Sequence, residues 1–243
     1  MLKKLNSVLR NPVLLLTFKA IILSLLLLSV INHKWLVVIY FAAAFYFYFS
    51  GVSGGRQFLA SFLTLIVVSL LAVNLPVVSG KLSVIISLLF GVILFLILGV
   101  KNLSFVNRPP IYHFLNNFLF LTVFIMFYAS DKSQFFIVKY LAAFFGIYFL
   151  FREALAFMSL PVSRLNLLSF GLALSIFQFL WVISLLPIGF LNAGALTLVL
   201  ILITKDMVFA HLSGNLNRTM ILKNITLLIV FVLIIFAASK WAL

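Results

Sequence analysis

The sequence predicts an all-α fold, a polytopic integral membrane helix bundle of about nine transmembrane helices, with the N-terminus in and the C-terminus out. Two observations predict it. Hydrophobic residues make up 66% of the 243 residues and charged residues only 8%, whereas water-soluble domains carry roughly 25% charged residues. The apolar residues also gather in long runs without the alternation of barrel strands, so the membrane-spanning elements must be helices.

Nine apolar runs are long enough, or nearly so, to cross a hydrocarbon core of about 30 Å, which takes about 20 helical residues. They cover 12–31, 35–51, 57–75, 82–100, 111–129, 135–152, 166–187, 193–212 and 221–240. The run 35–51 is the shortest, at about 26 Å if it is wholly helical. No connection between runs is long enough for a soluble domain, so we expect a single transmembrane domain over residues 1–243.

Basic residues indicate which helix ends face the cytoplasm. Counted on alternate sides of nine spans, eleven lysines and arginines fall on the side of the N-terminus and four on the other side. Because cytoplasmic connections carry an excess of Lys and Arg, we expect a cytoplasmic N-terminus. The eleven are Lys3, Lys4, Arg10, Arg56, Lys101, Arg108, Arg152, Arg164, Lys205, Arg218 and Lys223, and the four are Lys34, Lys81, Lys132 and Lys240.

Composition also excludes several classes of chemistry. The net charge of +14 comes from bases scattered singly between apolar runs, and not from a patch that would follow nucleic-acid phosphates. The chain has no cysteine, which excludes disulfides and thiolate metal sites. Zinc-binding helices, phosphate-binding glycine loops and nucleophile elbows are missing as well. We therefore predict no metal, no cofactor and no nucleic-acid partner.

Acidic residues are so scarce that each one near an apolar run is a candidate site residue. A charged group at the centre of a helix costs about 2.5–3.5 kcal/mol on insertion scales, so it tends to be kept for function or paired. Asp206 directly follows Lys205, and Glu153 directly follows Arg152. Neighbouring helical residues point about 100° apart, so the partners of both acids are expected on other helices.

Each acid allows two interpretations. If the helix of Asp206 continues through the following MVFAHL, the carboxylate lies about two turns inside the membrane and needs a base from a neighbouring helix. If the helix ends near Thr204, Asp206 is an ordinary interfacial residue. Glu153 is turned inward, on the face of Gly146, if its helix continues to Met158. Otherwise it is a solvated residue at the helix end.

Other polar residues lie at or near the predicted cytoplasmic side. Arg152 and Arg164 flank one connection, and His113 lies near the start of the run 111–129. Gln178 continues a polar stripe of the run 166–187. A basic vestibule open to the cytoplasm suits an anionic ligand or a lipid head group. The candidate ligand-binding residues are Asp206, Glu153, Arg152, Arg164, His113 and Gln178.

Three classes of function remain open. The first is a permease-like or accessory membrane subunit that binds a small solute or lipid at the vestibule. The second is an integral membrane enzyme acting on an anionic lipid-linked substrate, with Glu153, Asp206 and a histidine transferring protons. The third is a structural or assembly subunit without a ligand. The lack of a recognised catalytic constellation favours the non-catalytic classes. We expect a multi-pass protein of the cell membrane, and specifically of a prokaryotic cytoplasmic membrane. Its expected partners are the lipid bilayer and an anionic lipid, a small solute or another membrane subunit.

Overall fold

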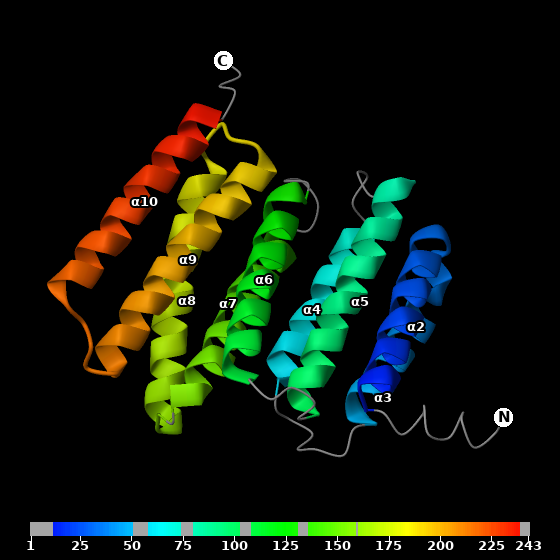
Figure 1. The fold of residues 1–243 in the computed structure, drawn as a ribbon. Coiled ribbons are helices and arrows are strands. Elements are labelled where there is room, and N and C mark those ends of the chain that lie inside the picture. Colours follow the sequence, from blue (N-terminus) through cyan, green and yellow to red (C-terminus); the bar gives the residue numbers. More distant parts are fainter. Residues whose placement is uncertain are drawn as a thin grey trace. The chain divides into compact units, whose positions relative to one another are not determined.

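The computed structural model describes residues 12–50, 58–73, 80–102, 108–130, 136–158 and 160–238. All regular structure in these residues is helical (Figure 1), which confirms the predicted all-α class. The helices begin and end within a few residues of the predicted runs. They are α2 (Pro12–Asn32), α3 (Val37–Phe49), α4 (Leu59–Val73), α5 (Lys81–Lys101), α6 (Arg108–Ala129), α7 (Phe136–Leu155), α8 (Val162–Ser184), α9 (Phe190–Leu212) and α10 (Arg218–Ala238), with short 3-10 helices η1 (Lys34–Leu36) and η2 (Ala156–Met158).

Seven of these helices are long and apolar enough to cross a membrane, and α3 and α4 are shorter. With 13 residues in α3 and 15 in α4, the two helices measure about 20 Å and about 22 Å. Both lengths fall below the hydrocarbon thickness of about 30 Å. The chain is therefore an all-helical protein with several candidate membrane spans. Crossing by all nine helices, like the orientation of the termini, stays a prediction.

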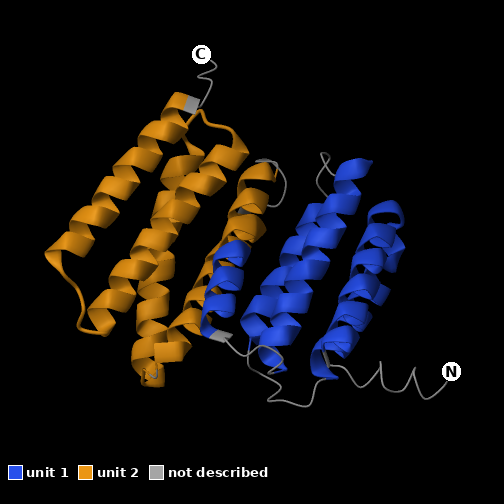
Figure 2. Ribbon diagram, viewed as in Figure 1, with its two compact units in different colours: residues 1–119 blue, residues 120–243 orange. Residues whose placement is uncertain are grey.

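The helices divide into two compact units, residues 1–119 and residues 120–243, and the boundary falls within α6 (Figure 2). Within each unit, successive helices run in opposite directions (Figure 1), as short connections between helices require. The units are described separately below. The predicted single domain over residues 1–243 stays a prediction.

Small side chains bring α2 and α5 together in unit 1. Ser83, Ser87 and Gly91 follow one another at a spacing of four on α5, and all three are buried. A Cβ at Gly91 would overlap Ser24 Oγ and would lie 3.0 Å from Ala20 O, both on α2. Lipid chains are as apolar as the side chains they touch, so helices in a membrane associate through close packing of this kind.

A buried lysine connects α5 to the end of α3 in unit 1. Lys101 is 1% exposed. Its Nζ donates to Tyr48 O and lies 3.7 Å from the centroid of the Tyr48 ring. Lys19 Nζ of α2 donates to Ser50 Oγ at the same helix end, at 2.7 Å. The C-terminus of a helix carries the negative end of its dipole, so both cations stabilise the last turn of α3. The ring of Tyr48 in turn stacks on Phe62 of α4, at 4.3 Å.

Aromatic rings join α7 to α8 in unit 2. Phe144 of α7 lies between Phe170 and Phe177 of α8, with ring centroids 5.6 Å and 5.8 Å away. Tyr140 also contacts Phe177, at 5.7 Å. All three pairs meet edge to face, the arrangement that the charge distribution of aromatic rings favours. This ladder runs toward the end of unit 2 at which α7 begins and α8 ends.

We predict that Gly91→Ala destabilises the protein while Gly171→Ala does not. The added methyl at Gly91 meets α2, and overpacking of this kind costs about 1–3 kcal/mol. A Cβ at Gly171 has no atom within 4 Å, so there the better helix propensity of Ala should add up to about 1 kcal/mol. The free energy of unfolding, measured by detergent titration, checks both values. Equal effects of the two substitutions would contradict the close approach of α2 and α5.

We predict that Lys101→Met lowers the free energy of unfolding by about 1–3 kcal/mol, because it removes the hydrogen bond that the buried ammonium donates to Tyr48 O. Methionine keeps the length of the apolar stem, so lost packing contributes little. The matched control is Lys81→Met at the exposed first residue of the same helix. Its effect should stay within about 0.5 kcal/mol. A loss no larger than that of the control would show that the buried ammonium does not stabilise α3.

Candidate functional site

Four of the six residues proposed from the sequence lie at one end of unit 2. Arg152 and Glu153 are near the end of α7, Arg164 is in the first turn of α8, and Asp206 is near the end of α9. The alternating helix directions bring these helix ends to the same side of the unit (Figure 1). Arg152, Arg164 and Asp206 are exposed, and Glu153 is half-buried.

The helix of Asp206 continues beyond it to Leu212, which meets the condition for a carboxylate inside the membrane. Its side chain nevertheless points out of unit 2 and forms no ion pair within the described residues. The neighbouring Lys205 is only 4% exposed, and its Nζ lies 5.7 Å from the centroid of the Phe120 ring. The charged residue that unit 2 buries here is thus Lys205, which the sequence analysis had counted only among the bases that indicate the cytoplasmic side.

Other polar groups at this end of unit 2 are buried amides. Asn166 of α8 and Asn224 of α10 each have a buried polar atom, Oδ1 and Nδ2 respectively, without a hydrogen-bond partner among the described residues. Glu153 lies where α7 gives way to the 3-10 helix η2. Gly146 of α7 faces α6, since a Cβ there would make an ordinary contact with Val123 Cγ2, at 3.9 Å.

His113 and Gln178 lie apart from these four residues. His113 belongs to unit 1, is half-buried, and has its ring 6.2 Å from that of Tyr112. Gln178 is exposed on α8, about 21 Å along the helix axis from Arg164. Ser175 of the same stripe donates to Gly171 O within its own helix, at 3.0 Å, and all of these side chains face out of unit 2. The cytoplasmic vestibule, and a ligand contact at Gln178, stay predictions.

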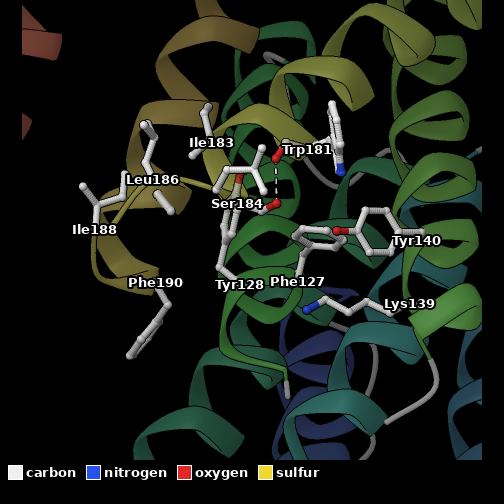
Figure 3. A pocket seen from close by; sticks show the side chains of 12 residues that line it. Phe127, Tyr128, Lys139, Tyr140, Trp181, Ile183, Ser184, Leu186, Ile188 and Phe190 are labelled. Carbon is white, nitrogen blue, oxygen red and sulfur yellow. Dashed lines mark hydrogen bonds between the residues drawn. The ribbon is translucent and has the colours of Figure 1, made fainter. Parts of the chain in front are cut away.

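The opposite end of unit 2 contains a cavity of about 270 Å³ (Figure 3). It lies where α6 and α8 end and where α7 and α9 begin, so four helices and one connection supply its wall. Most of the lining residues are aromatic or aliphatic. They are Phe127, Tyr128, Lys139, Tyr140, Trp181, Ile183, Ser184, Leu185, Leu186, Ile188, Phe190 and Ala193.

Lys139 is the charged residue of this lining. Its Nζ lies 4.5 Å from the centroid of the Phe127 ring and donates to Ser130 O, at 3.0 Å. The Tyr140 ring stands edge to face against Phe127, with 5.0 Å between centroids. The side chain thus contacts both an aromatic face and a carbonyl that follows the last turn of α6. The cavity therefore combines one positive group with an aromatic wall.

The hydroxyl of Tyr128 links three helices beside the cavity. It donates to Leu180 O of α8 at 3.2 Å and lies 2.9 Å from Thr197 Oγ1 of α9. The next carbonyl of α8, at Trp181, accepts from Ser184 Oγ at 2.6 Å (Figure 3). Buried polar groups in a helix bundle hold the backbones in register when they are satisfied in this way.

Comparisons with protein-family models, curated proteins and solved structures find no match for this chain. Its function is inferred here from the geometry of its own residues.

The sequence analysis missed the cavity. In the sequence, aromatic residues at the ends of apolar runs indicate interfacial anchors, and Lys139 is a single base one turn inside its run. The local signal is that Phe127-Tyr128 and Lys139-Tyr140 flank one short connection and must meet if the two helices form a hairpin.

We predict that Tyr128→Phe lowers the free energy of unfolding by about 1 kcal/mol, because it removes a hydrogen bond between helices. The control is Tyr148→Phe on α7, whose hydroxyl forms no hydrogen bond within the described residues. That variant should be neutral to within about 0.5 kcal/mol. Detergent unfolding followed by circular dichroism measures both. Indistinguishable variants would contradict the role of the Tyr128 hydroxyl as a link between helices.

Proposed function

We propose that this protein is a non-catalytic, multi-pass membrane protein, permease-like or accessory, that binds a lipid or a small amphiphilic solute in the cavity of unit 2. The observation that carries the proposal is the cavity itself, with an aromatic wall and the ammonium of Lys139. Ligand sites in proteins are typically such concave, mostly apolar spaces with a few polar groups that orient the ligand.

The position of the cavity supports an amphiphilic occupant. Its wall consists of the terminal turns of helices that are long enough to span a membrane. In a helix that spans the membrane, such turns reach the level where lipid head groups meet the hydrocarbon. The exposed residues at its rim are apolar, with Trp181 54% exposed and Leu185 68% exposed. A ligand here would contact polar groups inside the cavity and lipid chains outside it.

The chemistry of the lining supports binding rather than catalysis. The described side chains that line it include no carboxylate and no imidazole, the groups that most often act as general bases. The Ser184 hydroxyl donates to Trp181 O, which leaves that hydroxyl without an activating base. No group of three potential metal ligands occurs in the described part of the chain.

Binding of a lipid or solute is also among the non-catalytic functions that the sequence favours. The cavity that supports it, however, lies at the other end of unit 2 from Arg152, Arg164 and Asp206. By the predicted orientation, this end faces away from the cytoplasm. We therefore place the proposed site in the outer leaflet of the cell membrane. The cytoplasmic vestibule is a separate proposal that depends on how the inner helix ends assemble.

We predict saturable binding of an amphiphile at Trp181. The full chain carrying Trp35→Phe and Trp241→Phe, in nanodiscs of phosphatidylcholine, keeps Trp181 as its single tryptophan. A single-chain monoacylglycerol or its phosphate, brominated near the head, should quench this fluorescence saturably and with a stoichiometry near one, and the unbrominated compound should reverse it. Bromine quenches only at close contact.

The matched control retains Trp35 instead, through Trp181→Phe and Trp241→Phe. Trp35 is 71% exposed and lies outside the cavity, so its quenching should rise in proportion to the probe in the membrane, without saturation. Linear quenching of both fluorophores by every probe would overturn the proposed function.

A further inference from the structure

We propose that Trp181 and Ser184 of α8 together bind a neutral, hydroxyl-bearing head group of a single-chain amphiphile at the wall of the cavity. This inference rests on the proposed function and adds the class of head group and the two side chains that recognise it. Lys139, whose ammonium donates to Ser130 O, plays no part in it. The support is the hydrogen-bonding capacity that Trp181 and Ser184 leave open.

Trp181 places an open donor at the cavity. Its indole lines the cavity and is 54% exposed, and the ring nitrogen lies on the edge of the indole nearest Tyr140 (Figure 3). An indole N–H can donate but cannot accept. Within the described residues this N–H forms no hydrogen bond. An acceptor supplied by a ligand would satisfy it without displacing any hydrogen bond of the protein.

Ser184 places an open acceptor on the same stretch of helix. Its single hydroxyl hydrogen is used, since Oγ donates to Trp181 O at 2.6 Å (Figure 3). A hydroxyl oxygen also has two lone pairs that can accept, and no described residue donates to those of Ser184. Residues three apart on a helix are neighbours, with about 5–6 Å between their Cβ atoms. The donor of Trp181 and the acceptor of Ser184 therefore belong to one short stretch of the wall.

This combination of donor and acceptor selects among head groups. A hydroxyl can accept from the indole and donate to the serine at the same time. A carboxylate can only accept, so its oxygens would face the lone pairs of Ser184 without a hydrogen between them. A quaternary ammonium has neither donor nor acceptor and would leave both groups unbonded. A glycerol or another polyol head group therefore fits best, because each of its hydroxyls carries both functions.

The rest of the lining suits the apolar part of such a molecule. Leu185, Leu186, Ile188 and Phe190 follow Ser184 in the chain and line the same cavity, and Leu185 is 68% exposed. Mostly apolar walls with a few polar groups that fix the orientation of the ligand are the usual composition of binding sites. An acyl chain attached to the head group can thus contact this wall and the surrounding lipid.

The test compares two competitors that differ in their donors, a monoacylglycerol and its di-O-methyl ether. The ether keeps the oxygens and loses the hydroxyl hydrogens. Each displaces a monoacylglycerol that carries a diazirine in its chain from the full protein in phosphatidylcholine nanodiscs, and cross-linking is measured by mass spectrometry. The monoacylglycerol should compete about two- to tenfold better than the ether, which is the contribution of one hydrogen bond.

Two variants assign this preference to the proposed side chains. Ser184→Ala removes the acceptor and should abolish the preference, while the affinity for the ether stays the same. Trp181→Phe keeps an aromatic ring but removes the N–H, so both competitors should bind about two- to tenfold more weakly.

The matched controls are Ser175→Ala and Trp35→Phe. Ser175 likewise donates to a carbonyl of its own helix, Gly171 O, and neither Ser175 nor Trp35 lines the cavity. Both controls should therefore behave as the unmodified protein. A preference that survives Ser184→Ala, or that Ser175→Ala removes equally, would overturn the assignment of the head group to this wall, and so would unchanged binding in Trp181→Phe.

The remaining outcomes distinguish the two proposals. Equal competition by the alcohol and the ether in the unmodified protein would overturn the hydroxyl-bearing head group and leave the proposed function standing, whereas no saturable cross-linking would overturn both. Displacement of the diazirine probe by free glycerol at matched concentration would show a soluble polyol as the ligand and would overturn the requirement for a chain.

Discussion

The hydroxyl of Tyr128 is the interaction on which the arrangement of unit 2 depends. It joins α6 to α8 through Leu180 O and lies within hydrogen-bond distance of Thr197 on α9. Apolar side chains gain little by leaving lipid for a helix interface, so polar contacts and close packing determine how such helices meet. Tyr128 also lines the cavity, so the contact that joins the three helices lies directly beside it.

Polar contacts and close packing also determine how the helices of unit 1 meet, with different residues. Gly91, Ser87 and Ser83 let α5 approach α2 closely, and Lys101 reaches from α5 to the last turn of α3. A charge of this kind is tolerated in an apolar unit because a helix C-terminus and an aromatic ring surround it. In unit 2, Lys139 meets a similar combination of carbonyl and ring, but at the wall of a cavity. The difference in surroundings makes Lys101 a structural cation and Lys139 a candidate ligand contact.

The fold could be predicted from the sequence because length and apolarity alone determine which segments cross lipid. Within the described residues, the nine α-helices follow the nine predicted runs, and the shortest of them, α3, corresponds to the run expected to be shortest. The sequence could not show that Lys205 is buried while Asp206 is exposed. Neighbouring residues of a helix point in different directions, and the sequence does not show which face of α9 meets α6. The cavity was missed for a related reason. Tyr128, Lys139 and Trp181 come from three helices, and only their packing shows that they meet.

The scarcity of acids directed attention to Asp206 and Glu153, because an intramembrane carboxylate is costly. The charged side chain that unit 2 buries at this point is, however, that of Lys205, while Asp206 beside it is exposed on the surface of the unit. The residues that border an enclosed space are ordinary interfacial types, which sequence reasoning assigns to anchoring. In this chain, the polar side chains that indicate how helices meet are those that donate to backbone carbonyls of neighbouring helices.

Photo-crosslinking locates the ligand most directly. A single-chain amphiphile carrying a diazirine next to its head group is incubated with the full chain in nanodiscs, and labelled peptides are mapped by mass spectrometry. We expect saturable labelling within residues 127–140 and 181–193, with competition by the unlabelled compound. Saturable labelling confined to 152–166 and 205–224, at the opposite helix ends, would contradict the cavity as the binding site and would favour the vestibule around Arg152, Arg164 and Asp206.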